Sequence, residues 1–463
     1  MVTKFRVGLF LALHIFAVTG EFLTEGIEVD RFCYPKLHKN TRKSCECNSD
    51  SSPPWGLRVV NIDCSFKSLK TEDFSEMLPL YTDRLDLTWN ALQRVPALSS
   101  ETLRHLNLMH NNISTIVAKN FINMFNLREL YLSWNSIQSI ETNAFDELGH
   151  LQILDLSHNN LHSLGFQIFS PLMILESLYL SWNRQLNQTE GIQDLDFYQT
   201  FGVNINLKTL KLEACSLGNI TLPKKVVLKE LDLRRNRLTE IPQSLPSTLE
   251  KIDLSENLFL TLNEEDTKRL PQIRELYMED MPVLHTLDEN AFVPLQSLEK
   301  ISFQNSRRLS HIDGHTFGAN STPSPRLHSM IFRGTGLQSF NSTLSPIFFQ
   351  LSALDLHGVP LRCDCNLVWL KNVRLETNGR CFKPSRMRGI TLTSADASDF
   401  SCERWPRWIY GIIILGLIVL CSVGIYLIVM GLRPHGGVTM RRKVGPGSPY
   451  SRVTIEPNRQ EQY

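Results

Sequence analysis

The middle of the chain carries leucines at fixed spacings, and each period closes on a polar residue. One period places Leu103, Leu106, Leu108 and Asn111 in the frame L-x-x-L-x-L-x-x-N-x-L, where x is any residue. The frame recurs at intervals of about 21 to 24 residues across residues 85–356, which gives about twelve units. A period of this length is typical of solenoids, in which one small structural unit stacks on the next.

Each period predicts a short strand followed by a turn. The two leucines of L-x-L point to one face of the strand, and the residue between them points to the other face. One such strand cannot bury its apolar face, so neighbouring periods stack into a parallel sheet over a continuous leucine core. The sequence therefore predicts a curved solenoid with turns and short helices on its convex side. Recurring phenylalanines predict an aromatic spine beneath that side: Phe121, Phe145, Phe169, Phe292 and Phe317.

The polar residue of each period has a structural explanation. After the strand the chain turns inward, and an asparagine amide can donate and accept hydrogen bonds to the backbone that is buried there. We expect a ladder of such residues: Asn90, Asn111, Asn135, Asn159, Asn183, Asn236 and Asn257. Cys215 occupies the same position in its own period. A thiol is a weak donor that tolerates burial, so we expect Cys215 to be reduced and structural.

Two apolar segments outside the repeats predict the topology. Residues 1–20 carry Lys4 and Arg6, then an apolar run and small residues, as secretory signal peptides do. Residues 409–432 carry no charge, and as a helix they exceed the roughly 30 Å hydrocarbon core of a bilayer. Basic residues at 441–443 follow this segment. The positive-inside rule therefore predicts a single-pass type I plasma-membrane protein with an extracellular N-terminus.

The predicted cytoplasmic tail, residues 433–463, is too short for a folded signalling domain. Tyr450 and Val453 fit the pattern Y-x-x-Φ, in which Φ is a bulky apolar residue, and this pattern resembles endocytic sorting signals. Tyr450 and Val453 are therefore the candidate sorting residues, and we expect an inward signal to need a co-receptor.

Eight of the ten cysteines lie in two groups that flank the repeats. The first group is Cys33, Cys45, Cys47 and Cys64, and the second is Cys363, Cys365, Cys381 and Cys402. Even numbers in a secreted chain predict two small disulfide knots, and four cysteines allow three pairings. Zinc is the alternative, but neither group has the paired C-x2-C spacing of common zinc sites. We expect neither a metal nor another cofactor.

The residues after the last repeat carry a family resemblance. Residues 360–370 read PLRCDCNLVWL, which resembles the C-terminal cap of extracellular leucine-rich-repeat proteins, and residues 33–64 resemble the matching N-terminal cap. That family includes adhesion molecules, growth-factor co-receptors and innate immune receptors. The resemblance implies the pairs Cys33–Cys47, Cys45–Cys64, Cys363–Cys381 and Cys365–Cys402.

The caps, the repeats and the apolar segments together predict the domain order. It is a signal peptide (1–20), an N-terminal cap (21–80), about twelve repeats (81–360), a C-terminal cap (361–403), a transmembrane helix (409–432) and a cytoplasmic tail (433–463).

Candidate binding residues lie in the N-terminal half of the predicted sheet. Tyr131 and Tyr179 occupy outward strand positions, and Trp134 and Trp182 directly precede a ladder asparagine. Tyrosine and tryptophan are enriched in binding hot spots. A packing role is the alternative for the tryptophans, because Ser-Trp-Asn and Ser-His-Asn turns occur in many such repeats. Charged residues such as Arg234 dominate the C-terminal half, where we expect a solvated face.

Five N-x-S/T sequons are present, at Asn112, Asn187, Asn219, Asn320 and Asn341. None lies on a strand that the pattern predicts. A glycan is bulky and blocks the surface that carries it, so bare strands would leave the concave face open to a partner. The alternative is that sequons are retained in turns for no functional reason.

The remaining observations narrow the function class. Lysine and arginine total 48 against 47 aspartate and glutamate, so no basic excess points to a nucleic-acid partner. The chain contains no G-x-S-x-G, H-E-x-x-H or P-loop motif, and we do not expect an enzyme. The main hypothesis is a receptor or adhesion protein that binds an extracellular or cell-surface protein. The alternative is a co-receptor that captures a secreted signalling ligand.

Overall fold

The computed structural model describes residues 45–49, 60–74, 78, 81–186, 194–201, 206–223, 225–318, 326–373, 377–402 and 407–431. The chain divides into two compact units, Met1–Ser401 and Cys402–Tyr463. Several predicted features lie outside the described residues and stay predictions: the signal peptide 1–20, Cys33, Asn187, Asn320, Tyr450 and Val453.

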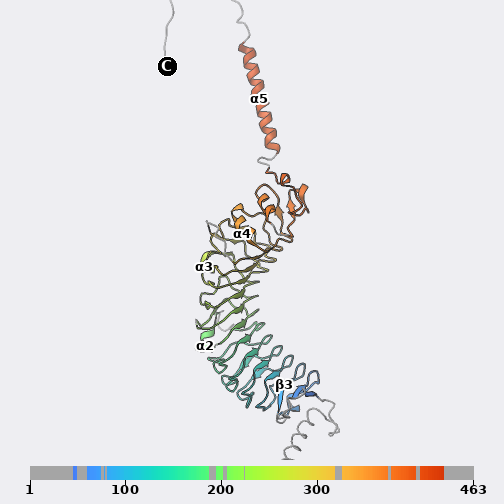
Figure 1. The fold of residues 1–463 in the computed structure, drawn as a ribbon, viewed down its shortest axis with the longest axis vertical. Helices are drawn as coiled ribbons and strands as arrows, with labels where there is room; N and C mark the ends of the chain where they lie inside the picture. Colours follow the sequence, from blue (N-terminus) through green and yellow to red (C-terminus); the bar gives the residue numbers. More distant parts are fainter. Residues whose placement is uncertain are drawn as a thin grey trace, which may run out of the picture. The chain divides into compact units, whose positions relative to one another are not determined.

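A 14-stranded sheet runs along the first unit, and its strands follow one another in chain order (Figure 1). The pair β1–β2 is antiparallel, and every later pair in this sheet is parallel. The strands are β1 (Glu46–Ser49), β2 (Val60–Asp63), β3 (Thr82–Asp86), β4 (His105–Asn107), β6 (Glu129–Tyr131), β8 (Ile153–Asp155), β9 (Ser177–Tyr179), β11 (Thr209–Lys211), β13 (Glu230–Asp232), β14 (Lys251–Asp253), β16 (Glu275–Tyr277), β18 (Lys300–Ser302), β20 (Ser329–Ile331) and β21 (Ala353–Asp355). The predicted parallel solenoid is confirmed.

Short helices and short strands form the side of the solenoid that lies opposite the 14-stranded sheet. In Figure 1 the labelled helices α2 (Phe197–Phe201), α3 (Glu264–Thr267) and α4 (Ser345–Gln350) lie along the outer side of the arc. Minor sheets, which the leucine pattern did not predict, pair β5 (Thr115–Ile116) with β7 (Ser139–Ile140), β10 (Asp194–Asp196) with β12 (Asn219–Thr221), and β17 (Thr286–Leu287) with both β15 (Thr261–Leu262) and β19 (His311–Ile312). The 3₁₀ helices are η2 (Thr71–Asp73), η4 (Ser342–Leu344), η5 (Val368–Asn372), η6 (Ser385–Met387) and η7 (Ala397–Asp399).

The strand register stacks the leucines into one core. Leu130 of β6 lies opposite Leu106 of β4 and Leu154 of β8, and all three side chains are fully buried. On the convex side the rings of Phe121, Phe145 and Phe169 follow one another at centroid separations of 6.2 Å. The aromatic spine is therefore present beneath the convex surface, and Phe292 and Phe317 continue it with centroids 4.9 Å apart.

The asparagine ladder satisfies the buried backbone of the turns, as predicted. Asn159 is representative: its Nδ2 donates to the carbonyl oxygens of Leu132 and Leu156, each at 3.0 Å. Its Oδ1 accepts the Ile137 backbone N–H at 2.9 Å. One side chain thus links its own repeat to the preceding one, and removing it would leave several buried polar groups without partners.

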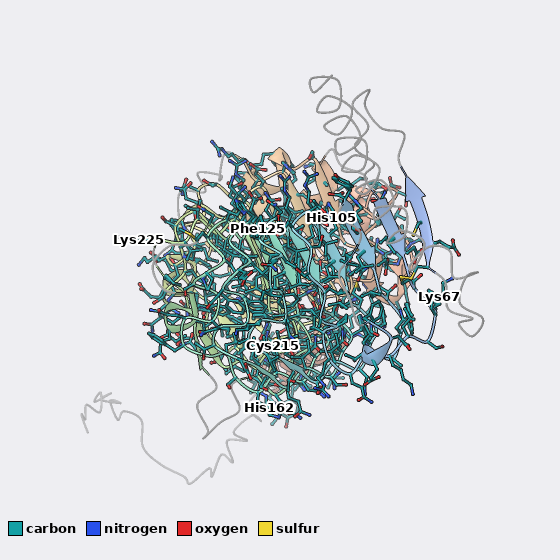
Figure 2. All side chains as sticks on the ribbon, turned by 90° about the horizontal axis from the view of Figure 1, so that it is seen from below. Lys67, His105, Phe125, His162, Cys215 and Lys225 are labelled. Atoms are coloured by element: carbon teal, nitrogen blue, oxygen red, sulfur yellow. A yellow bond between two sulfur atoms is a disulfide. The ribbon has the colours of Figure 1, made fainter. Side chains whose placement is uncertain are left out.

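Cys215 takes the ladder position of its repeat and lies in the interior of the solenoid, whereas His162 and Lys225 lie at the periphery (Figure 2). Its thiol donates to the Leu180 carbonyl oxygen at 3.3 Å, and its backbone N–H donates to Asn236 Oδ1 at 3.1 Å. Burial raises the pKa of the Cys215 thiol to about 12. The free, buried cysteine is therefore structural, as its spacing predicted.

Disulfides close the solenoid near both ends. Cys45 is bonded to Cys64 beside β2, and Cys363 is bonded to Cys381, the first residue of β23 (Cys381–Lys383), which pairs with β22 (Leu361–Arg362). These two bonds are among the pairs that the resemblance implies. The other cysteines of the described residues in these groups, Cys47, Cys365 and Cys402, are also disulfide-bonded. Their predicted partners stay predictions.

The second unit contains one long apolar helix, α5 (Arg407–Gly431). Its segment Ile409–Gly431 is long and apolar enough to cross a membrane. The predicted last residue of the span, Leu432, lies outside the described residues.

Candidate protein-binding face

Three outward residues lie side by side at the ends of β6, β8 and β9. The register places Tyr131 opposite Asp155, and Asp155 opposite Tyr179. All three are half-buried, because the strand alternation turns the neighbouring leucines into the core and these side chains toward the concave side. The structure thus brings the two predicted tyrosines to one face with Asp155 between them. Sequence reasoning missed Asp155, because one acid at an outward strand position resembles an ordinary solvated residue.

These three side chains have different neighbours. The Tyr131 hydroxyl donates to Glu129 Oε2 at 3.1 Å, and burial together with Glu129 raises the pKa of Tyr131 to about 12. Lys211 Nζ lies 5.4 Å from the centroid of the Tyr179 ring, within range of a cation–π contact. Asp155 Oδ1 accepts the backbone N–H of Ser157 at 2.9 Å and also the Ser157 hydroxyl.

A column of stacked rings runs beside this face, from the N-terminal cap region across the first five repeats. Its members, called here the aromatic column, are Phe66, Trp89, His110, Trp134, His158 and Trp182. Successive ring centroids are 5.6, 3.9, 5.2, 3.9 and 5.4 Å apart, and successive ring planes are within 17° of parallel. The rings therefore cover one another's faces and leave their edges outward.

Every ring of the aromatic column stands on left-handed backbone. The φ angles of its residues lie between 52° and 65°. This conformation costs a bulky residue of order 1 kcal/mol or more. The equivalent positions of the following repeats, Ala214, Arg235, Glu256 and Asp280, are also left-handed, and the last repeats hold Asn305, Gly334 and Gly358, which tolerate it better. Stacked aromatic pairs contribute roughly 0.5–1.5 kcal/mol each, which offsets the backbone cost.

The sequence left two roles open for Trp134 and Trp182, partner binding and packing, and the geometry of the column is compatible with both. Trp134 and Trp182 pack against His158, yet Trp134 remains 49% exposed. The guanidinium groups of Arg184 and Arg235 lie 4.9 and 5.4 Å from the Trp182 ring and end the column. Packing and presentation to a partner are therefore compatible here.

Sequence reasoning did not include Phe66 in the column, and it did not address the charge of His158. Phe66 lies two residues after the cap cysteine Cys64 and outside the L-x-L frame. This distance from the cysteine was the only sequence feature that could have indicated its place in the column. Burial lowers the pKa of His158, so this imidazole is neutral at pH 7.

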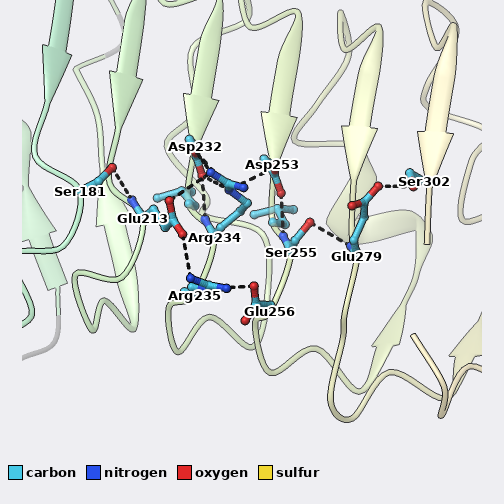
Figure 3. A network of polar contacts seen from close by, with 12 residues as sticks. Ser181, Glu213, Asp232, Arg234, Arg235, Asp253, Ser255, Glu256, Glu279 and Ser302 are labelled. Atoms are coloured by element: carbon cyan, nitrogen blue, oxygen red, sulfur yellow. Dashed lines mark hydrogen bonds and ion pairs between the residues drawn. The ribbon is translucent and has the colours of Figure 1, made fainter. Parts of the chain in front are cut away.

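The C-terminal half of the concave side holds a charged network (Figure 3). The Arg234 guanidinium reaches Glu213 Oε2 and Asp232 Oδ2 at 3.1 Å each and Asp253 Oδ2 at 3.5 Å. Arg235 joins Glu213 to Glu256. The side chains of Arg234, Arg235 and Glu256 are 40%, 44% and 39% exposed, which agrees with a solvated face. Glu213 and Asp232, which the sequence did not single out, are only 14% and 10% exposed.

Asp253 is the carboxyl of this network with the most perturbed acidity. Burial raises its pKa to about 6, and the neighbouring Asp232 carboxylate acts in the same direction. Arg234 opposes the shift only in part, because its single guanidinium is shared among three carboxylates. The network is therefore short of positive charge at neutral pH.

Three sequons lie within the described residues. Asn112 follows the ladder residue Asn111 in a turn, and Asn341 caps the N-terminus of η4. Asn219 is the first residue of β12, a strand that the leucine pattern does not predict. β12 belongs to a minor sheet, and the 14-stranded sheet carries none of these three asparagines. Glycosylation itself stays a prediction.

The described residues contain no cluster of three or more histidine, cysteine, aspartate or glutamate side chains arranged to hold a metal ion. The face combines aromatic rings, hydroxyls and charged groups on the 14-stranded sheet.

Comparison with known proteins agrees with this architecture. The model of the leucine rich repeat family matches residues 82–137, 125–184 and 227–280. Tsukushi of Gallus gallus is 26% identical over 397 residues, which cover 81% of this chain and 88% of Tsukushi. The transforming growth factor beta activator LRRC33 of Danio rerio is 27% identical over 279 residues, which cover 55% of this chain and 38% of LRRC33. The chain spans less than half of the length of other curated relatives, 34% and 44% in two cases.

A solved structure shares the fold. It is the octameric complex of latrophilin 3, Unc5D and FLRT2 (LRR), in which one chain aligns at a TM-score of 0.50 with 19% identity, covering 76% of this chain and 97% of that one. The relatives are repeat proteins and not enzymes, and this chain is not an enzyme either.

Proposed function

Because the chain is a leucine-rich-repeat protein with one helix able to span a membrane, we propose that it is a cell-surface receptor or adhesion protein. Its partner is an extracellular or cell-surface protein that docks on the N-terminal half of the concave face. The docking residues are Tyr131 and Tyr179 with the neighbouring Trp134 and Trp182.

One observation carries the proposal: aromatic side chains are gathered in two parallel rows on a rigid sheet. Tyr131 and Tyr179 form one row, and the aromatic column forms the other. Hot spots favour such side chains, because they give a large contact area at a low cost in side-chain entropy. The main sheet has 14 strands, and at about 4.8 Å per strand it offers ample length for a standard interface of about 800 Å² per partner.

Cell clustering tests the adhesion function. Full-length chain on otherwise non-adherent cells should cluster those cells with one another or with cells that display the partner. The double variant Tyr131→Ala, Tyr179→Ala should abolish clustering at equal surface expression. Tyr277→Ala is the matched control, because Tyr277 occupies the same strand position in β16. Clustering that survives the double variant would remove these tyrosines from the proposed site.

A second function has its own support. The name of LRRC33, a transforming growth factor beta activator, favours a co-receptor or modulator that captures a secreted ligand. In that case cells displaying the chain do not cluster but retain a labelled secreted growth factor, and the double tyrosine variant releases it.

The proposal places the chain in the plasma membrane with its N-terminus outside and α5 across the bilayer. Labelling of intact cells should then reach an epitope placed after residue 20, and an epitope at the C-terminus should need permeabilisation. Glycosidase treatment should lower the apparent mass, and Asn112→Gln should remove part of that shift. The reverse labelling pattern would reject this orientation.

A further inference from the structure

We propose that Asp155, flanked by Tyr131 and Tyr179, is a receptor site for an arginine or lysine side chain of the protein partner. The inference rests on the proposed function and names the chemistry of the ligand. Asp155 lies between the two tyrosines in the strand register, and its negative charge would bind the basic side chain of the partner.

The first argument is the charge of the three strands concerned. The outward residues of β6, β8 and β9 are Glu129, Tyr131, Ile153, Asp155, Ser177 and Tyr179, which include two carboxylates and no cation. Glu129 is engaged by the Tyr131 hydroxyl and lies 2.9 Å from the His105 imidazole. Within the described part of the chain the Asp155 carboxylate accepts hydrogen bonds only from Ser157, and no lysine or arginine pairs with it.

The second argument comes from the C-terminal half of the same sheet, where the chain supplies the cations itself. Lys251 and Lys300 lie 5.9 and 5.0 Å from the Tyr277 ring centroid, and the neighbouring Asp253 lies 3.5 Å from Arg234. A tyrosine beside an aspartate on adjacent strands is therefore an arrangement that this sheet fills with basic side chains. In the N-terminal half Lys211 lies over the Tyr179 ring, but among the described residues no cation lies over Tyr131 or pairs with Asp155.

The geometry favours a cation over other ligands. A basic side chain over a tyrosine face gains a cation–π contact, and the adjacent carboxylate adds a charge-assisted hydrogen bond. An acidic segment would meet repulsion from Asp155 and Glu129. A purely apolar segment would leave the Asp155 carboxylate partly desolvated without compensation.

The test uses full-length chain displayed on cells and two phage libraries of random 12-residue peptides, one complete and one lacking arginine and lysine. The proposal expects binders only from the complete library. Replacing their key arginine by citrulline should weaken binding at least tenfold. Asp155→Asn should do the same, whereas Asp253→Asn should leave binding unchanged.

Asp155→Asn is expected to fold, because Asn107 holds the same position in β4 and accepts the Met109 backbone N–H in the same way. The library that lacks arginine and lysine could yield peptides whose binding depends on Tyr131 and Tyr179. That result would overturn this inference and leave the proposed docking site intact. Binders indifferent to both tyrosines would remove the inference and the site together. If neither library yields a binder, the cation site is rejected.

Discussion

At the scale of single residues, the ladder position decides how each turn is closed. Asparagine fills it in most repeats because its amide both donates and accepts, as Asn159 does. Later repeats use Ser306 and Thr335, whose hydroxyls donate to the carbonyl oxygens of Met278 and Phe332. Sequence spacing predicted the asparagines and Cys215. It did not predict Ser306 and Thr335, because a hydroxyl in a polar turn has no distinctive pattern.

Replacing Asn159 by alanine should lower the free energy of unfolding by on the order of 3 kcal/mol, because buried carbonyl and N–H groups of two neighbouring repeats lose their partners. Denaturant unfolding of the full chain in detergent measures the loss. The exposed neighbour Asn160 provides the control, and Asn160→Ala should change stability by no more than about 0.5 kcal/mol. Equal effects of the two variants would contradict the ladder.

The thiol of Cys215 should resist alkylation in the native protein. With a pKa of about 12, it stays protonated as the pH rises from 7 to 9, and it is fully buried. Mass spectrometry after maleimide treatment of the Cys421→Ser variant, which removes the other free cysteine of the described residues, should show labelling only once the protein is unfolded. Rapid labelling of the folded chain at pH 8 would show that the turn opens.

At the scale of strands and turns, the leucine frame predicted which residues face outward but not which of them touch. Tyr131 and Tyr179 could be placed on one face from alternation alone. The stacking of Trp134 on His158 depends on the left-handed turn, and the shared guanidinium of Arg234 depends on rotamers that bridge three strands. Such lateral contacts join residues in different repeats, so no local pattern records them.

The charged network gives stability a pH dependence that can be assigned to Asp253. Its folded pKa of about 6 lies above the ordinary aspartate value of 3.8, so its stabilising contribution is complete below pH 3.8 and is lost as the pH rises through 6. Between pH 7 and pH 5 the natural protein should gain about 1 kcal/mol relative to Asp253→Asn. Denaturant unfolding at the two pH values measures this difference, and parallel pH profiles of the two proteins would contradict the assignment.

At the scale of the whole solenoid, each repeat contacts mainly its neighbours, so stability is distributed along the chain. The sequence predicted this organisation and the need for closed ends, because an open stack exposes its core. It did not predict that β1 and β2 of the cap region extend the main sheet, since their residues lack the L-x-L frame.

Removing the disulfide between Cys45 and Cys64 should therefore act locally. The bond closes a loop with a sequence separation of 19, worth about 3 kcal/mol, so the double serine variant should loosen the first repeats. Hydrogen exchange should accelerate in β2, β3 and β4 and stay unchanged in β16, β18 and β20. Acceleration along the entire sheet would show that the repeats unfold as one cooperative unit.

Tryptophan and histidine alternate along the aromatic column, so the chemistry of the concave side changes from each repeat to the next. Both of the 3.9 Å separations run from a tryptophan to the following histidine, and Leu-Tyr-Leu-Ser-Trp-Asn at 130–135 returns at 178–183, with Leu-Asp-Leu-Ser-His-Asn between them. The translational unit is thus a pair of repeats, about 10 Å long. A ligand displaced by one pair from Tyr131 to Tyr179 meets the same chemistry again, whereas a displacement by one repeat exchanges tyrosine for Asp155. Loss or duplication of a single repeat would therefore interrupt the alternation of tryptophan and histidine repeats, whereas loss or duplication of two adjacent repeats would preserve it.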